Sequence, residues 1–91
     1  MFYYVYVLLS ETENDGKFYT GYTKNLKLRF EQHAKKKVKS TKIHGLMKLI
    51  YYEACLNQSD ATHKEKNLKT YLGKMFIRNR LKSYLTGQAY A

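Results

Sequence analysis

Five side chains of the sequence are of the types that hydrolysis of a phosphodiester bond requires. They are two phenols, a guanidinium, an imidazole and a carboxylate, each on an expected regular element: Tyr6, Tyr19, Arg29, His33 and Glu65. The reaction needs a water or a phenol that loses its proton, a cation against the phosphoryl oxygens and a neutralised leaving oxygen. An arginine suits the second task, because its planar fork matches a phosphate and stays charged. A lone carboxylate is a fair ligand for Mg²⁺, which keeps most of its waters.

Each of these residues also has an ordinary explanation. A tyrosine in a strand is usually a core residue with its hydroxyl at the surface. A histidine in a helix is most often an ordinary helix residue with no catalytic role. Lys69 follows Glu65 at a spacing of four residues, so a solvated ion pair accounts for that carboxylate. Composition and spacing alone therefore indicate a basic α/β protein that binds nucleic acid.

The amino-terminal part of the chain predicts a β-hairpin. Residues 2–9 are an unbroken run of aromatic and β-branched or aliphatic residues, typical of a central strand covered on both faces. A polar connection follows at 10–16, and residues 17–22 predict a second short strand. Since alternate residues share a face, Tyr6 and Tyr19 could meet across the pair if the register permits.

The remainder of the chain predicts one helix, one strand and then two short helices, or one long helix broken at Gly73. A helix starts after Thr23, and Arg29 and His33 lie four residues apart on one of its stripes, where they can address a single ligand. A basic loop at 35–45 precedes a strand at 46–54, and helical spacing runs from residue 59 with Gly73 as a stop. The order β-β-α-β-α-α predicts an α/β (α+β) fold, a small three-stranded, mostly antiparallel sheet flanked by helices. We expect one domain over residues 1–91.

Charge indicates the partner. The net charge is +10, and the first 16 residues carry three acids and no base, so the positive excess lies after them. Such a surface attracts phosphate backbones whatever the base sequence. The lysines expected to contact nucleic acid are those of the basic loop and one on a later helix: Lys35, Lys36, Lys37, Lys39, Lys42 and Lys69.

Other features bear on the compartment. The single cysteine, Cys55, cannot form an internal disulfide and lacks zinc-finger spacing, which favours a reducing compartment. The apolar run at 2–9 is too short to span a bilayer and lacks the preceding basic residues of an export signal. We therefore expect a cytoplasmic protein without a membrane partner.

The ordered motifs of the sequence resemble those of the GIY-YIG nuclease family. Tyr4-Val5-Tyr6 and Tyr19-Thr20-Gly21 look like the two tripeptides that name the family. Arg29-x3-His33 follows at the family's distance, and the segment around Glu65 looks like the one that carries its metal-binding glutamate. The likeness runs from about residue 2 to residue 85, and the compact form is similar to single-domain members grouped with the nuclease domain of the excision-repair protein UvrC.

The resemblance implies a role for each residue of the constellation. Tyr6 is the general base or helps to activate the attacking water, and Tyr19 holds the metal-bound water or the phosphate. Arg29 stabilises the pentavalent charge, and His33 assists proton transfer. Glu65 binds one Mg²⁺ or Mn²⁺ ion. Asn79 lies near the position of a supporting asparagine in some members.

The chain departs from the family pattern at two positions. Tyr4 stands where the first tripeptide usually has glycine, and Tyr22 stands where some members carry a lysine. A free phenol has a pKa of about 10, so a catalytic Tyr6 also needs a nearby cation or metal that lowers it. Since 91 residues leave no room for an attached DNA-binding domain, we expect low specificity or a protein partner that supplies it.

Three functions remain open at this level. The first is a divalent-metal-dependent endonuclease that acts on DNA with low or structure-based specificity. The second is a nucleic-acid-binding module that has the fold and the charge with weak or absent turnover, and it predicts salt-sensitive binding without cleavage. The third is an RNA-associated basic protein whose tyrosine rings stack on unpaired bases.

Overall fold

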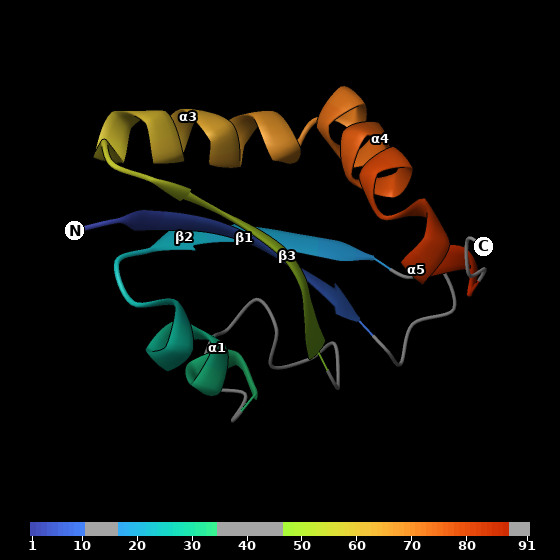
Figure 1. Ribbon diagram of the computed structural model, residues 1–91, viewed down its shortest axis with the longest axis horizontal. Helices are drawn as coiled ribbons and strands as arrows, with labels where there is room; N and C mark the ends of the chain where they lie inside the picture. Colours follow the sequence, from blue (N-terminus) through green and yellow to red (C-terminus); the bar gives the residue numbers. More distant parts are fainter. Residues whose placement is uncertain (11–16, 35–46, 88–91) are drawn as a thin grey trace.

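A three-stranded antiparallel sheet forms the centre of the protein (Figure 1). The computed structural model describes residues 1–10, 17–34 and 47–87, and the side chains of 33 and 34 are outside this description. The strands are β1 (Tyr3–Ser10), β2 (Phe18–Thr23) and β3 (Met47–Cys55), in the order β2-β1-β3. The four residues from Val5 to Leu8 are all buried, as expected for a central strand with both faces covered. The predicted central position of the first strand is confirmed.

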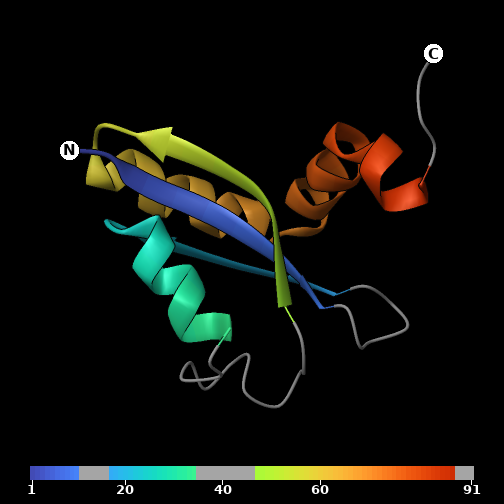
Figure 2. The same ribbon diagram turned by 60° about the horizontal axis from the view of Figure 1, so that its bottom comes forward.

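Helices cover both faces of the sheet. The helices are α1 (Leu26–Ala34), α3 (Gln58–Leu68), α4 (Tyr71–Arg80) and α5 (Lys82–Thr86). Figures 1 and 2 show α1 on one face and α3 on the other. Over the described residues the element order is β-β-α-β-α-α-α, which confirms the predicted fold class. The described residues after β3 form one short helix more than the sequence indicated.

Strand alternation divides the core into two layers. Val5 and Val7 point to the side of α3 and α4, whereas Tyr6 and Leu8 point to the side of α1. The first layer is completed by three buried helix residues, Ala61, Leu68 and Ile77. The second contains Met47 and the partly buried Leu26 and Phe30. Tyr6, the last residue of the first tripeptide, is therefore a core residue of the layer on the α1 side.

A bulge in β3 adjusts its side chains to these two layers. Val7 pairs with Tyr51 and Leu8 pairs with Leu49, so Ile50 is the extra residue on β3. Both Ile50 and Tyr51 consequently pack on the α3 side, while Leu49 packs on the α1 side.

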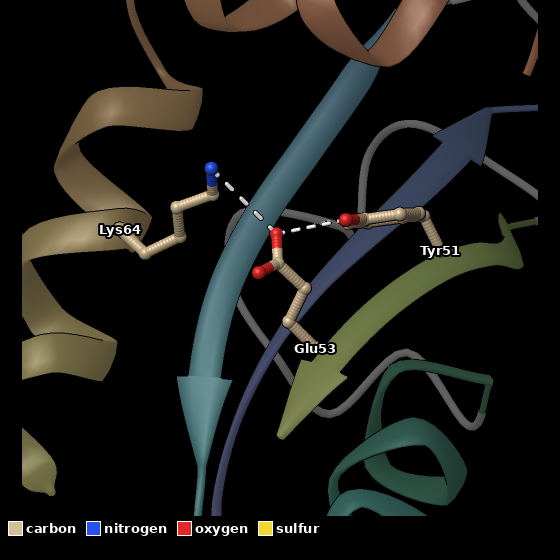
Figure 3. Close-up of polar contacts among 3 residues, drawn as sticks. All are labelled: Tyr51, Glu53 and Lys64. Carbon is tan, nitrogen blue, oxygen red and sulfur yellow. Dashed lines mark hydrogen bonds and ion pairs between the residues drawn. The ribbon is translucent and has the colours of Figure 1, made fainter. Parts of the chain in front are cut away.

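A polar bridge fastens β3 to α3 (Figure 3). The Tyr51 hydroxyl donates to Glu53 Oε2 at 2.8 Å, and Lys64 Nζ of α3 lies 3.7 Å from the same oxygen. Burial, together with the Glu53 carboxylate as acceptor and as negative charge, raises the pKa of Tyr51 to about 12. The Tyr51 phenol therefore keeps its proton throughout the neutral range, so it remains the donor of the hydrogen bond to Glu53.

The break between the last two long helices differs from the prediction. Gly73 is the third residue of α4 rather than a stop, because Thr70 caps that helix and accepts from the Gly73 amide at 3.1 Å. A Cβ atom at position 73 would lie 2.6 Å from the Cα of Leu68 and would also overlap the Asn67 carbonyl oxygen. Glycine is thus required here because α4 crosses the end of α3 closely, and the prediction of a stop was wrong.

The basic loop lies outside the described residues, and with it Lys35, Lys36, Lys37, Lys39 and Lys42. Of the helices described, none is both long and apolar enough to cross a membrane.

Candidate active site

A pocket of about 540 Å³ surrounds the edge strand β2. Residues 18–22 of β2 and Tyr6 of β1 form its wall. Four charged side chains complete it: Arg29 of α1, Glu65 of α3, Lys69 directly after α3, and Lys74 of α4. Because α1 and α3 lie on opposite faces of the sheet, Arg29 and Glu65 reach the pocket from opposite sides of the edge strand (Figure 2). Because β2 is at the edge of the sheet, side chains from helices on both faces of the sheet line the same pocket.

Tyr6 and Arg29 are in direct contact in this pocket. Tyr6 is 3% exposed, and Arg29 Nε–H donates to its hydroxyl oxygen at 3.3 Å. A second guanidinium nitrogen of Arg29 donates to Gln32 Oε1, also at 3.3 Å. Asn25 directly precedes α1, the helix that carries Arg29, and its side chain accepts from the Leu28 amide at 3.0 Å.

Gly21 makes room for the Tyr6 phenol. Gly21 is the cross-strand partner of Tyr6, and a Cβ atom at position 21 would lie 2.7 Å from Tyr6 Cζ and would overlap the hydroxyl oxygen. The phenol therefore lies across the backbone of β2 where only a glycine permits it. Sequence reasoning did not include Gly21 among the site residues, although a glycine inside a strand is a general sign of close approach.

The environment of Tyr6 keeps its proton on. Burial raises the pKa of Tyr6 above its ordinary value of 10.0, and this effect exceeds the lowering by the hydrogen bond and the charge of Arg29. The negative charge of Glu65 raises the pKa further. Arg29 is a cation next to the phenol, as a catalytic Tyr6 needs, but alone it does not bring the pKa of the phenol below 10.0.

Glu65 is the carboxylate of the pocket. Its side chain is 19% exposed, and its Oε2 lies 3.7 Å from Nζ of Lys69, whose side chain is 56% exposed. The predicted helix pair is therefore present, but it is loose and screened by solvent.

The donor atoms of the pocket fit a divalent ion that takes one protein carboxylate and keeps water as its other ligands. Within the described part of the chain, no three His, Cys, Asp or Glu side chains are grouped as a metal cage. A single carboxylate beside phenol oxygens suits Mg²⁺, which retains waters as most of its ligands. Glu65 is the residue that would hold it.

The pocket is positively charged overall. Arg29, Lys69 and Lys74 face a single carboxylate, so the space favours an anion such as a phosphodiester. Lys74 was missing from the sequence-based site, since its position depends on how α4 crosses α3, for which the sequence carries no signal.

The other predicted residues are distributed differently. Tyr19 lines the pocket, but it pairs with Leu8, so it lies diagonally from Tyr6 on the same face rather than opposite it. Asn79 is exposed on α4 and does not line the pocket. The backbone of His33 continues α1 one turn beyond Arg29, while its side chain lies outside the described part.

Fold and pocket together define a small α/β domain with a charged pocket around the edge strand of its sheet. Residues 2–82 match the family model described as the GIY-YIG catalytic domain, and the chain belongs to this family of nuclease domains.

Bacterial relatives of known sequence or structure are similar to most of the chain. A UPF0213 protein of Staphylococcus epidermidis is 41% identical over 59 residues, which are 64% of this chain and 72% of the relative. A UPF0213 protein of Staphylococcus aureus is 35% identical over 66 residues, 71% of this chain and 80% of the relative. The solution NMR structure of the UPF0213 protein BH0048 from Bacillus halodurans superposes with a TM-score of 0.53 at 30% identity, covering 87% of this chain and 84% of that one.

Proposed function

We propose that this protein is a divalent-metal-dependent endonuclease that hydrolyses phosphodiester bonds in DNA with low or structure-based specificity. The observation that carries the proposal is the single pocket that Tyr6, Tyr19, Arg29 and Glu65 line together with two lysines. A family of nuclease catalytic domains supports the same reaction class. We propose that the chain acts as one domain in the cytoplasm, where DNA is its partner.

Substrate binding is assigned to the cations of the pocket. Arg29 can offer its guanidinium to the phosphoryl oxygens while it keeps its contact with Tyr6, because an arginine has five N–H donors. Lys74 and Lys69 neutralise the phosphate charge from the opposite side of β2. As negative charge grows on the phosphoryl oxygens during attack, these groups bind the transition state more tightly than the substrate.

Proton transfer is assigned to the phenols and the histidine. Tyr6, as the phenolate, takes a proton from the attacking water while the water oxygen bonds to phosphorus, and Tyr19 orients that water or the phosphate. The bond from phosphorus to the leaving oxygen then breaks, and His33 assists the transfer of a proton to that oxygen. Because the pKa of Tyr6 is raised, only a small fraction of the enzyme holds this base as a phenolate at neutral pH.

Glu65 is the proposed ligand for one Mg²⁺ or Mn²⁺ ion. When bound, the ion supplies Lewis acidity toward the phosphate oxygens and the attacking water. The carboxylate would exchange its loose contact with Lys69 for the ion, and Lys69 would then be free to approach the substrate.

The role of Arg29 can be tested by nicking of supercoiled plasmid and cleavage of branched DNA in the presence of Mg²⁺. Arg29→Ala should lower the rate by about 10²-fold or more, since it removes the charge that faces the transition state. Lys27→Ala is the matched control, because Lys27 is an exposed cation two residues earlier on α1 that does not line the pocket. Equal activity of wild type and Arg29→Ala would contradict the assigned role.

The raised pKa of Tyr6 favours a second candidate function. A phenol that stays protonated and a carboxylate with a lysine beside it suit a nucleic-acid-binding module, of DNA or structured RNA, with little or no turnover. That function predicts salt-dependent binding, with log K falling by roughly 0.9 per log unit of salt for each phosphate contacted, and no cleavage with any divalent ion.

A further inference from the structure

One side of α4 continues the pocket. Gly73 and Ile77 are the buried positions of this helix, so they face the rest of the protein. Tyr71, Lys74 and Arg78 lie three and four residues apart and therefore share one side of the helix. Lys74 lines the pocket, and the guanidinium carbon of Arg78 lies 5.1 Å from the ring centre of Phe18, which also lines it.

The opposite side of α4 has a different environment. The ring of Phe76 packs edge-on against Tyr51 of β3, with the ring centres 6.2 Å apart. The charge of Arg80 acts on the same tyrosine. Tyr71, Lys74 and Arg78 thus share a side of α4 that includes the pocket residue Lys74 and lies away from Phe76, and these three residues are called the α4 stripe.

The charge of the α4 stripe is suited to an anionic polymer. No acidic residue follows Glu65 in the sequence, whereas six basic residues do: Lys66, Lys69, Lys74, Arg78, Arg80 and Lys82. Among the residues that the structure describes, neither Lys74 nor Arg78 forms an ion pair. Both cations can therefore neutralise phosphates without giving up a carboxylate.

Tyr71 adds a flat aromatic surface to this charge. It is the first residue of α4 and is 76% exposed, one turn before Lys74. A large exposed ring beside cations is the combination by which proteins bind single strands, with the phosphates on the charges and a base on the ring. Bases inside a duplex already stack on each other, so the ring can receive only an unpaired base.

We propose that the α4 stripe binds a single-stranded stretch of the DNA substrate next to the scissile phosphate. Tyr71 stacks on an unpaired base, while Lys74 and Arg78 hold the phosphates that lead into the pocket. The inference rests on the proposed function and deepens it, since it makes a junction between duplex and single strand the preferred substrate.

Binding without cleavage tests the stripe directly. Fluorescence anisotropy is measured in EDTA with oligothymidylate and with a duplex of equal strand length, at matched salt. Tyr71→Ala should weaken binding of oligothymidylate by about fivefold to a hundredfold, and that of the duplex by less than about twofold, because stacking on a base is lost. Leu72→Ala is the matched control, since Leu72 is the next residue and is 74% exposed, off the stripe.

The arginines provide a second, independent comparison. Arg78→Ala should reduce the slope of log K against log salt for the single strand by about 0.7, the value for one lost phosphate contact. Arg80→Ala, the same change on the opposite side of α4, should leave the slope nearly unaltered. Equal effects of the two arginines, or of Tyr71→Ala and Leu72→Ala, would overturn the proposal, as would much tighter binding of oligouridylate than of oligothymidylate.

Plasmid nicking, together with cleavage of a junction between duplex and single strand and of a plain duplex, is measured with Mg²⁺ for the same preparations and separates the endonuclease from the stripe. If wild type nicks DNA and Tyr71→Ala keeps an unchanged preference for junctions over duplex, the stripe is refuted and the endonuclease stands. If no preparation nicks DNA while Tyr71→Ala still loses binding to oligothymidylate, the endonuclease is refuted and the stripe stands as a binding site.

Discussion

At the scale of the residue, Tyr6 combines two properties that oppose each other. It is 3% exposed and belongs to the core, yet its hydroxyl reaches the pocket and accepts from Arg29. Burial holds the ring in one position, which favours precise chemistry, but it also raises the pKa of the phenol. The result is a firmly held phenol that is protonated in the neutral range.

The pH dependence of the rate follows from this property. Since the pKa of Tyr6 lies above 10.0, the phenolate fraction grows about tenfold for each pH unit below that value. We expect log rate for DNA nicking to rise with pH at a slope of about 1 across the neutral and mildly alkaline range, without a plateau. Tyr6→Phe should lower the rate and abolish the slope.

The Tyr6→Phe profile also separates the base from its alternatives. A slope that persists in Tyr6→Phe would mean that another group, or hydroxide itself, activates the water. A flat profile in wild type would mean that Tyr6 positions the water without taking its proton.

At the scale of the element, the pairing of β1 with β2 aligns Tyr6 with Gly21. Gly21→Ala places a methyl group against the Tyr6 ring, which is buried and cannot move away freely. We expect a loss of stability of about 1–3 kcal/mol, the range for an overpacked core, and a loss of nicking activity because the phenol shifts relative to Arg29. Thermal or denaturant unfolding measures the first effect.

A double-mutant cycle is the control for this prediction. Tyr6→Phe removes the hydroxyl oxygen with which the new methyl group overlaps, so Gly21→Ala should destabilise the Tyr6→Phe protein less than wild type. The same cost in both backgrounds would show that the methyl group acts on something other than the phenol.

Element type was predictable from the sequence, and contacts between elements were not. The apolar run at 2–9 indicates a strand because it is short and rich in aromatic and β-branched residues, and a strand covered on both faces needs no alternation. The register of β2 could not be derived, since a shift by two residues preserves every face, and so the sequence left open whether Tyr6 meets Tyr19 or Gly21. Gly73 was misread because a glycine that ends a helix and one that permits a close crossing look alike in sequence.

The candidate site was predictable to a similar degree. Tyr6, Tyr19, Arg29 and Glu65 were expected from residue type and motif, and all four line one pocket. Lys74 could not be expected, because its position depends on the path of α4 across the end of α3.

At the scale of the whole molecule, the edge position of β2 and the distribution of charge along the chain together place a basic surface around the pocket. β2 is at the edge of the sheet, so a pocket can reach around it and receive side chains from helices on both faces. The part of the chain after Glu65 has no acidic residue and supplies Lys74 to that pocket. A basic surface therefore leads to the one carboxylate of the pocket, an arrangement that brings a polyanion to the proposed ion.

The most direct test of this arrangement is the Mg²⁺-dependent nicking rate of supercoiled plasmid for Glu65→Gln beside Glu31→Gln. Both substitutions remove one negative charge, but Glu31 is exposed on α1 and does not line the pocket. We predict that Glu31→Gln retains the wild-type rate and that Glu65→Gln loses it by about 10²-fold or more, with DNA binding in EDTA preserved. Equal nicking by the two variants would contradict the account, because it would place the hydrolysis outside the pocket around β2.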